Sequence, residues 1–134
     1  MKTAALIFLT IFSIYSYAGD KPWVAWLIYP ANKNSAAVEM WPNNKGFIWK
    51  LLTHENELLT SIQQPETPDG YTYNQGGCSI DGTYRWDVIV SIKHRPDRPT
   101  SNDYYQVWVP SPEEKSFKLI HPKTVECTNE GYGI

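Results

Sequence analysis

The side chains that could carry out chemistry are few in this 134-residue chain, and they are scattered along it. The three histidines lie in different segments, and none belongs to an H-E-x-x-H motif or to a His–Cys cluster with zinc spacing. The G-x-S-x-G elbow of α/β hydrolases and the glycine-rich phosphate loops are missing as well. We therefore expect no metal site and no cofactor.

Carboxylate pairs are the remaining route to catalysis, because glycan cleavage uses two carboxyl groups on either side of a cleft. Asp69, Asp81 and Asp103 stand beside glycine or asparagine, which favours a role in turns. Asp87 falls on the polar face of a predicted strand. A β domain of this size also leaves little room for a substrate cleft, so the sequence predicts a protein that is not an enzyme.

Two predicted loops carry the residue types of contact surfaces. Residues 71–77 combine tyrosine, asparagine and glycine, and residues 94–98 combine histidine and two arginines with a proline that limits the entropy lost on binding. Asp97 lies between the arginines and could pair with one of them. The alternative is that these are ordinary loops whose aromatic side chains cover the edge of a small core. The candidate partner-binding residues are Trp41, Tyr71, Tyr73, Asn74, His94, Arg95 and Arg98.

The tryptophans keep a carbohydrate-binding or ligand-binding β module open as an alternative, since flat aromatic rings stack on sugar rings. Trp41 is the candidate for exposure, because it ends a predicted strand before Pro42. The other five fall inside predicted strands, where packing in the core is expected: Trp23, Trp26, Trp49, Trp86 and Trp108.

The first 18 residues have the anatomy of a cleavable export signal. Lys2 is followed by an apolar run over 4–14, and Ser16-Tyr17-Ala18 places small residues where a signal peptidase cuts, before Gly19. The run is too short to span a bilayer, which takes about twenty residues. We expect a single β domain over residues 19–134, located in the periplasm or, as a second choice, secreted, without a stable membrane anchor.

The two cysteines, Cys78 and Cys127, should form a disulfide in such an oxidising compartment. Charge excludes another class of partner: 12 Lys and Arg against 14 Asp and Glu give a net charge of −2, so we expect no binding to nucleic acid. With 42% hydrophobic and 19% charged residues, the chain is also too apolar to be disordered.

The elements that must position these residues are predicted to be short strands. Aromatic and β-branched runs separated by turn residues predict strands at 23–29, 37–41, 47–52, 83–93, 104–109, 116–121 and 124–127. The pattern of residues 53–62 favours a strand over a short helix. Residues 65–77 and 94–103 are predicted to be long loops. Alternation within 83–93 predicts that Tyr84, Trp86 and Val88 face the core while Ile89 faces mostly water. The fold class is therefore all-β, an antiparallel sandwich or bent barrel of about seven or eight strands with one disulfide.

This combination of export signal, one β domain, the Cys78–Cys127 pair and no catalytic constellation resembles the periplasmic immunity proteins. Those proteins bind and neutralise cell-wall-degrading effectors delivered by type VI secretion. The pattern is also similar to that of periplasmic lysozyme inhibitors. Both resemblances imply stoichiometric binding to a protein partner, a cognate effector or a glycan hydrolase, whose cleft is plugged. The resemblance is one of architecture and assigns no individual residue; the sequence leaves open whether the protein forms a homodimer.

Overall fold

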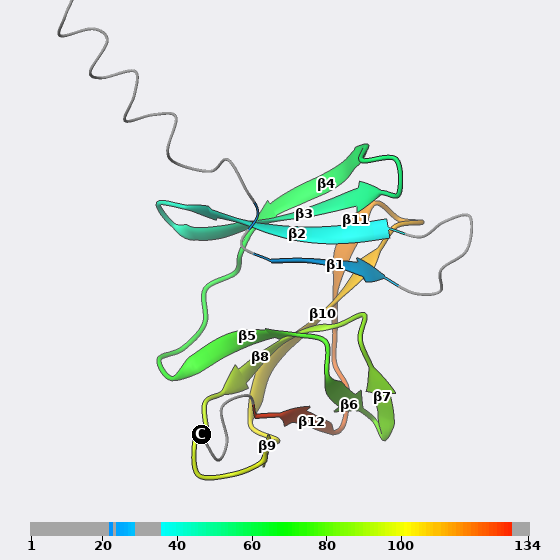
Figure 1. The fold of residues 1–134 in the computed structure, drawn as a ribbon. Coiled ribbons are helices and arrows are strands. Elements are labelled where there is room, and N and C mark those ends of the chain that lie inside the picture. The colour runs from blue at the N-terminus through cyan, green and yellow to red at the C-terminus, as the bar shows by residue number, and fades with distance from the viewer. Residues whose placement is uncertain (1–21, 23, 29–35, 130–134) are drawn as a thin grey trace, which may run out of the picture.

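The computed structural model describes residues 22, 24–28 and 36–129. The predicted export signal and its cleavage site lie outside these residues, as do Trp23 and the last five residues. All regular elements in the described part are β-strands, arranged in three four-stranded antiparallel sheets (Figure 1). The predicted all-β antiparallel fold is confirmed.

Sheet A has the strand order β1-β2-β3-β4. Gly46, with φ of 114°, closes the predicted hairpin, and the Asn43 side chain accepts the Lys45 N–H in the turn. The stretch after Thr53 makes a turn and then a strand, because the Thr53 hydroxyl accepts the N–H of Glu57 and bends the chain back. The strands are β1 (Val24–Ile28), β2 (Ala36–Asn43), β3 (Gly46–Thr53) and β4 (Leu58–Gln63).

Sheet B has the order β11-β10-β8-β5 and lies in the middle of the molecule (Figure 1). The prediction of one loop over 65–77 is wrong in its second half, where alternating Tyr and Thr residues form β5 against β8. The strands are β5 (Tyr71–Gln75), β8 (Ile89–Lys93), β10 (Tyr104–Ser111) and β11 (Ser116–Ile120).

Sheet C has the order β7-β6-β12-β9. The predicted strand 83–93 is wrong, because it breaks into β7, which belongs to sheet C, and β8, which belongs to sheet B. The bend is held by Arg85, which donates two hydrogen bonds to Asp87 at 2.8 Å each. With β9 and this division, the described part has twelve strands, more than the seven or eight predicted. The strands are β6 (Cys78–Ile80), β7 (Thr83–Arg85), β9 (Thr100–Ser101) and β12 (Val125–Thr128).

Sheet B is covered on both sides. The core against sheet A contains Trp49, Met40 and Leu51 packed with Ile89 and Phe117. The core against sheet C consists of smaller aliphatic side chains and the cystine, namely Cys78, Ile80, Val88, Val90, Ile92, Val107, Val125 and Cys127. The molecule is thus a three-layered sandwich with sheet B as the shared layer.

This layering explains why the face assignment on residues 83–93 is partly wrong. Val88, Val90 and Ile92 are buried as predicted, but Ile89 is also fully buried, because sheet A covers the face that was expected to meet water. Tyr84 and Trp86, predicted to face the core, are 53% and 60% exposed. Alternation gives the two faces of a strand but does not say how many of them are covered.

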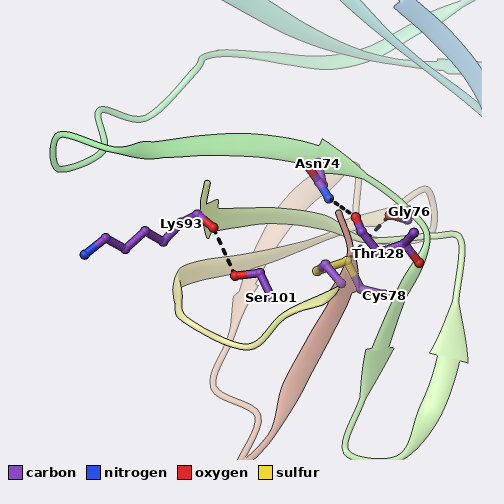
Figure 2. The surroundings of a disulfide bond; sticks show 7 residues. Asn74, Gly76, Cys78, Lys93, Ser101 and Thr128 are labelled. Atoms are coloured by element: carbon purple, nitrogen blue, oxygen red, sulfur yellow. Dashed lines mark hydrogen bonds between the residues drawn. A yellow bond between two sulfur atoms is a disulfide. The ribbon is translucent and has the colours of Figure 1, made fainter. Parts of the chain in front are cut away.

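The predicted disulfide is confirmed. Cys78 on β6 lies directly opposite Cys127 on β12, and their sulfur atoms are bonded. Figure 2 shows the bridge between these two strands, close to Gly76, Ser101 and Thr128. It joins segments that are 49 residues apart in the chain.

Candidate binding surface

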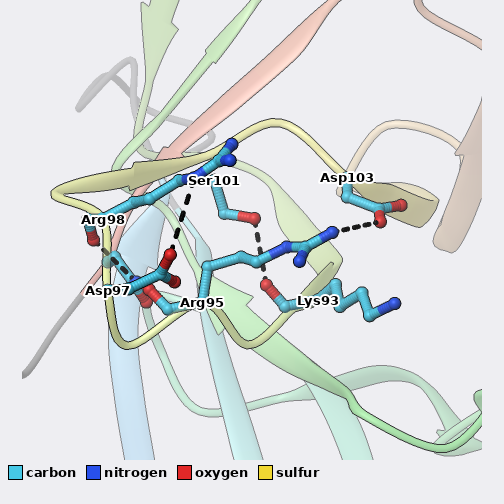
Figure 3. A network of polar contacts seen from close by, with 7 residues as sticks. Lys93, Arg95, Asp97, Arg98, Ser101 and Asp103 are labelled. Atoms are coloured by element: carbon cyan, nitrogen blue, oxygen red, sulfur yellow. Dashed lines mark hydrogen bonds and ion pairs between the residues drawn. The ribbon is translucent and has the colours of Figure 1, made fainter.

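Three strands of sheet B bring separate parts of the chain together at one end of the sheet. β5 begins at Tyr71, the segment after β8 carries Arg95, and the segment before β10 carries Asp103. The Tyr71 hydroxyl donates to one Asp103 carboxylate oxygen at 2.8 Å, and Arg95 Nη2 lies 3.5 Å from the other. The Arg95 and Asp103 side chains are 40% and 38% exposed, so this contact is open to solvent (Figure 3).

Tyr105 adds an exposed ring beside the half-buried Tyr71 at this end of the sheet. Its ring centroid lies 6.2 Å from that of Tyr71, and it is 48% exposed. The Asp103 carboxylate raises the pKa of Tyr71, chiefly because the phenol donates a hydrogen bond to it and an ionised phenolate would be repelled. We call Tyr71, Arg95, Asp103 and Tyr105 the loop cluster.

The segment between β8 and β9 is tied down by its backbone. The Asn129 side-chain amide donates to the carbonyl oxygens of Arg95 and Arg98, and the His94 N–H donates to Gly70. The His94 side chain is exposed beside the loop cluster. The Arg98 guanidinium lies 3.9 Å from Asp97, with both side chains more than 60% exposed, so this pair is weak (Figure 3). Arg95 is the better-positioned cation of the two.

Tyr73 lies next to the loop cluster, on the face of β5 that carries Tyr71, but its side chain packs inward, and Asn74 lies on the opposite face. Tyr73 packs edge-to-face on Trp49 at 5.0 Å, and its hydroxyl donates to Pro65 O at 3.1 Å. Burial between sheets A and B raises its pKa to about 12. Asn74 points to the other side of β5, where its amide donates to Thr128 O at 3.4 Å. Both side chains hold the layers together in this structure.

Trp41 lies on the outer face of sheet A, distant in the fold from the loops of sheet B. Its indole N–H donates to Glu39 at 2.9 Å, and Lys50 Nζ lies 4.4 Å above the ring. A cation over a tryptophan face is attracted by the ring quadrupole, so Trp41 is half-buried under its neighbours rather than freely displayed.

Sequence reasoning missed Asp103 and Tyr105 as members of the cluster. Asp103 was expected only to form a turn, and nothing local shows that it meets Tyr71, 32 residues earlier. The pair Tyr104-Tyr105 was a partial signal, since neighbouring strand residues point to opposite faces, but alternation does not say which of the two rings is exposed. Tyr104 is the partly buried one, and it packs against the core of sheets B and C.

Of the four carboxylates weighed for catalysis, Asp81, Asp87 and Asp103 have structural partners. Asp81 accepts the backbone N–H groups of Lys123 and Thr124, and Asp87 is paired with Arg85, which lowers the pKa of Asp87. Within the described residues, no three His, Cys, Asp or Glu side chains gather in a way that could hold a metal ion. The same part of the chain contains no helix long and apolar enough to cross a membrane.

Comparison with known protein families, with curated protein sequences and with solved structures finds no match for this chain. Its function is therefore inferred from the chemistry of its own residues. The loop cluster combines two aromatic rings, one guanidinium and one carboxylate on a braced sheet. Such an arrangement can bind a protein surface through stacking and charge-assisted hydrogen bonds.

Proposed function

We propose that this chain is exported to the periplasm, where it binds a cell-wall-degrading enzyme and neutralises it without turnover of its own. This is the action of immunity proteins against type VI effectors and of lysozyme inhibitors. The observation that carries the proposal is the loop cluster, in which Tyr71 and Asp103 hold Arg95 at the end of sheet B. The partner is the cognate effector or a glycan hydrolase.

The chemistry of the cluster suits the cleft of such an enzyme. A guanidinium carries five N–H donors, and the contact of Arg95 with Asp103 uses Nη2, so donors remain for a carboxylate of the partner. Glycan hydrolases line their clefts with carboxylates. Tyr and Arg are enriched among interface residues that contribute most to affinity, and the preformed Tyr71–Asp103 bond reduces the entropy lost on binding.

The experiment mixes the exported protein with a muramidase or an amidase at increasing molar ratio, on purified peptidoglycan. Muropeptide release is expected to fall in proportion to the added protein and to stop near equal molar amounts, and the protein alone is expected to release none. If no enzyme in such a panel, including any effector found to be encoded next to the gene, is bound or inhibited, the proposal is wrong.

Variants then test the surface itself. Arg95→Ala and Tyr105→Ala should each weaken the complex about thirtyfold, the equivalent of about 2 kcal/mol. Lys118→Ala is the matched control, because Lys118 is an exposed cation on β11, outside the cluster. Each variant should keep its unfolding free energy within about 0.5 kcal/mol. Unchanged affinity in both cluster variants would place the interface elsewhere.

A further inference from the structure

The outer face of sheet C carries a row of polar side chains with exposed aromatic rings at its edge. Ser79 lies directly opposite Tyr84 on β7 and opposite Glu126 on β12. Residues opposite one another in antiparallel strands share a face of the sheet. The neighbours of Ser79, Cys78 and Ile80, point into the core with sheet B, so the row Tyr84–Ser79–Glu126 faces outward.

Trp86 continues this row beyond the end of β7. It is 60% exposed, more than any other large hydrophobic side chain of the described residues. Its ring meets that of Tyr84 edge to face, with centroids 5.3 Å apart and an interplanar angle of 85°. The two rings therefore form an exposed aromatic corner at the edge of a polar face.

Two glycines lie directly against the backbone and rings of this corner. A Cβ atom on Gly76 would lie 2.8 Å from the Trp86 carbonyl oxygen and 3.0 Å from the indole Cε3, so only glycine allows this approach. A Cβ atom on Gly77 would lie 3.6 Å from the Tyr84 hydroxyl and 3.8 Å from the indole Cζ3. Both glycines have positive φ, and Gly76 N–H donates to Val88 O at 2.7 Å.

Two further constraints hold the same corner. The paired hydrogen bonds from Arg85 to Asp87 fix the residues on either side of Trp86. The disulfide fixes β6 to β12 directly behind the row, next to Gly76 and Thr128 (Figure 2). An exposed tryptophan held in one position has lost its conformational entropy before any ligand arrives, which favours binding.

We propose that this outer face of sheet C binds oligosaccharides of β-linked pyranose units. The C–H groups on the face of such a sugar carry partial positive charge and pack on the negative face of the Trp86 indole, with Tyr84 at its side. Hydroxyl groups of the sugar need donors and acceptors nearby, and Ser79, Glu126 and Thr128 supply them on the same face. The site is separate from the loop cluster and does not rest on the proposed inhibitory function.

The test titrates the exported protein with tetrasaccharides of β-1,4-linked N-acetylglucosamine and of β-1,4-linked glucose. Binding is followed by calorimetry and by the ¹H–¹⁵N signals of the tryptophan side chains. Saturable binding of at least one oligosaccharide is expected, with the largest shift at the Trp86 indole. Trp86→Ala should weaken binding about tenfold, the loss of one stacking contact. Glu126→Ala should weaken it about fivefold, the loss of one hydrogen-bonding side chain.

Leu58→Ala is the matched control, since it truncates a 57% exposed side chain on sheet A and should bind as the wild type does. Near-ultraviolet circular dichroism checks that each variant is folded, and Glu126→Ala decides the question if Trp86→Ala is not, because the Glu126 side chain is exposed. No saturable binding by the wild type overturns the proposal. Undiminished binding by the folded variants overturns it equally. Enzyme inhibition is measured separately, so either proposal can fail while the other stands.

Discussion

The two interfaces of sheet B are formed by different kinds of side chain. Toward sheet A, Trp49 meets Tyr73, Trp108 and Phe117 in edge-to-face contacts with centroids between 5.0 and 6.1 Å apart. Toward sheet C, the interface is made of valine and isoleucine side chains together with the cystine, whose disulfide links β6 and β12 within sheet C. One interface thus depends on a central aromatic ring, and the other on small aliphatic side chains packed on a sheet that a covalent bond braces.

The difference has consequences for where binding surfaces can be built. The aromatic interface leaves a hollow of about 290 Å³, bordered by Met40, Gln64 and Gln75 among others. It also contains the buried Ser91 hydroxyl, which has no hydrogen-bond partner. Sheet C carries the outer face with Tyr84 and Trp86 described above. The loop cluster is connected to the end of β12 through the hydrogen bonds of Asn129. The disulfide lies within sheet C and braces the outer face of that sheet, whereas the loop cluster belongs to sheet B, where Tyr71 also borders the hollow of the aromatic interface.

The largest effect is expected when the centre of the aromatic interface is removed. Trp49 is fully buried and contacts three other rings, so Trp49→Ala should lower the unfolding free energy by about 5 kcal/mol. Urea unfolding followed by circular dichroism measures this loss. Leu58→Ala, a change at a 57% exposed side chain of sheet A, should stay within about 0.5 kcal/mol. A loss below about 2 kcal/mol for Trp49→Ala would mean that the interface does not depend on this ring.

Removal of the covalent bond should have a slightly smaller effect. In the double variant Cys78→Ala with Cys127→Ala, two positions that are 49 residues apart in the chain are no longer linked. The unfolding free energy should fall by about 4 kcal/mol, mainly because the unfolded chain gains conformational entropy. Hydrogen exchange should show faster opening of β6 and β12 than of β2 and β3. Equal acceleration in all three sheets would contradict the division of the molecule into two differently stabilised interfaces.

A moderate effect is expected at the bend between β7 and β8. The Arg85 guanidinium lowers the pKa of Asp87, so this pair stabilises the folded protein above the ordinary carboxyl range near 3.8 and loses its contribution as pH falls through the lowered pKa. Asp87→Asn should cost about 1 kcal/mol at neutral pH, since both side chains are partly exposed. It should also flatten the stability profile below pH 4. A profile identical to that of the wild type would show that Asp87 does not titrate in this way.

The smallest effect is expected in the loop cluster. Because Asp103 raises the pKa of Tyr71, the cluster favours the folded state up to the ordinary phenol range near 10 and loses this contribution as pH rises through the raised pKa. In Asp103→Asn, the Tyr71 phenol should titrate at a lower pH than in the wild type. The ¹³Cζ signals of the tyrosines measure this shift, with Tyr71→Phe used for assignment. No change in the Tyr71 titration would mean that its hydrogen bond is absent in solution.

Much of the fold can be predicted from local sequence, because it depends on local chemistry. The hairpin before Phe47 follows from Asn43-Asn44-Lys45-Gly46, which supplies both a side-chain acceptor and positive φ. The disulfide follows from two cysteines in a chain whose sequence predicts export, since no other pairing exists. β10 and β11 follow from β-branched and aromatic runs on either side of a proline-containing turn.

The candidate surfaces were decided by the tertiary structure. Ile89 is buried because sheets A and C cover both faces of β8, and Trp86 is exposed because the chain bends away before β8 begins. The alternation of residue types along the sequence predicts neither the second covering sheet nor the bend. Arg95 meets Tyr71 through Asp103 only because β5, β8 and β10 are neighbours in sheet B. The amino-acid sequence alone predicted the pairing of the cysteines and most strands, but not β5, β6 and β9, since backbone preference and composition are local. Which rings are exposed depends on strand order and on the number of layers, and these are set by long-range packing.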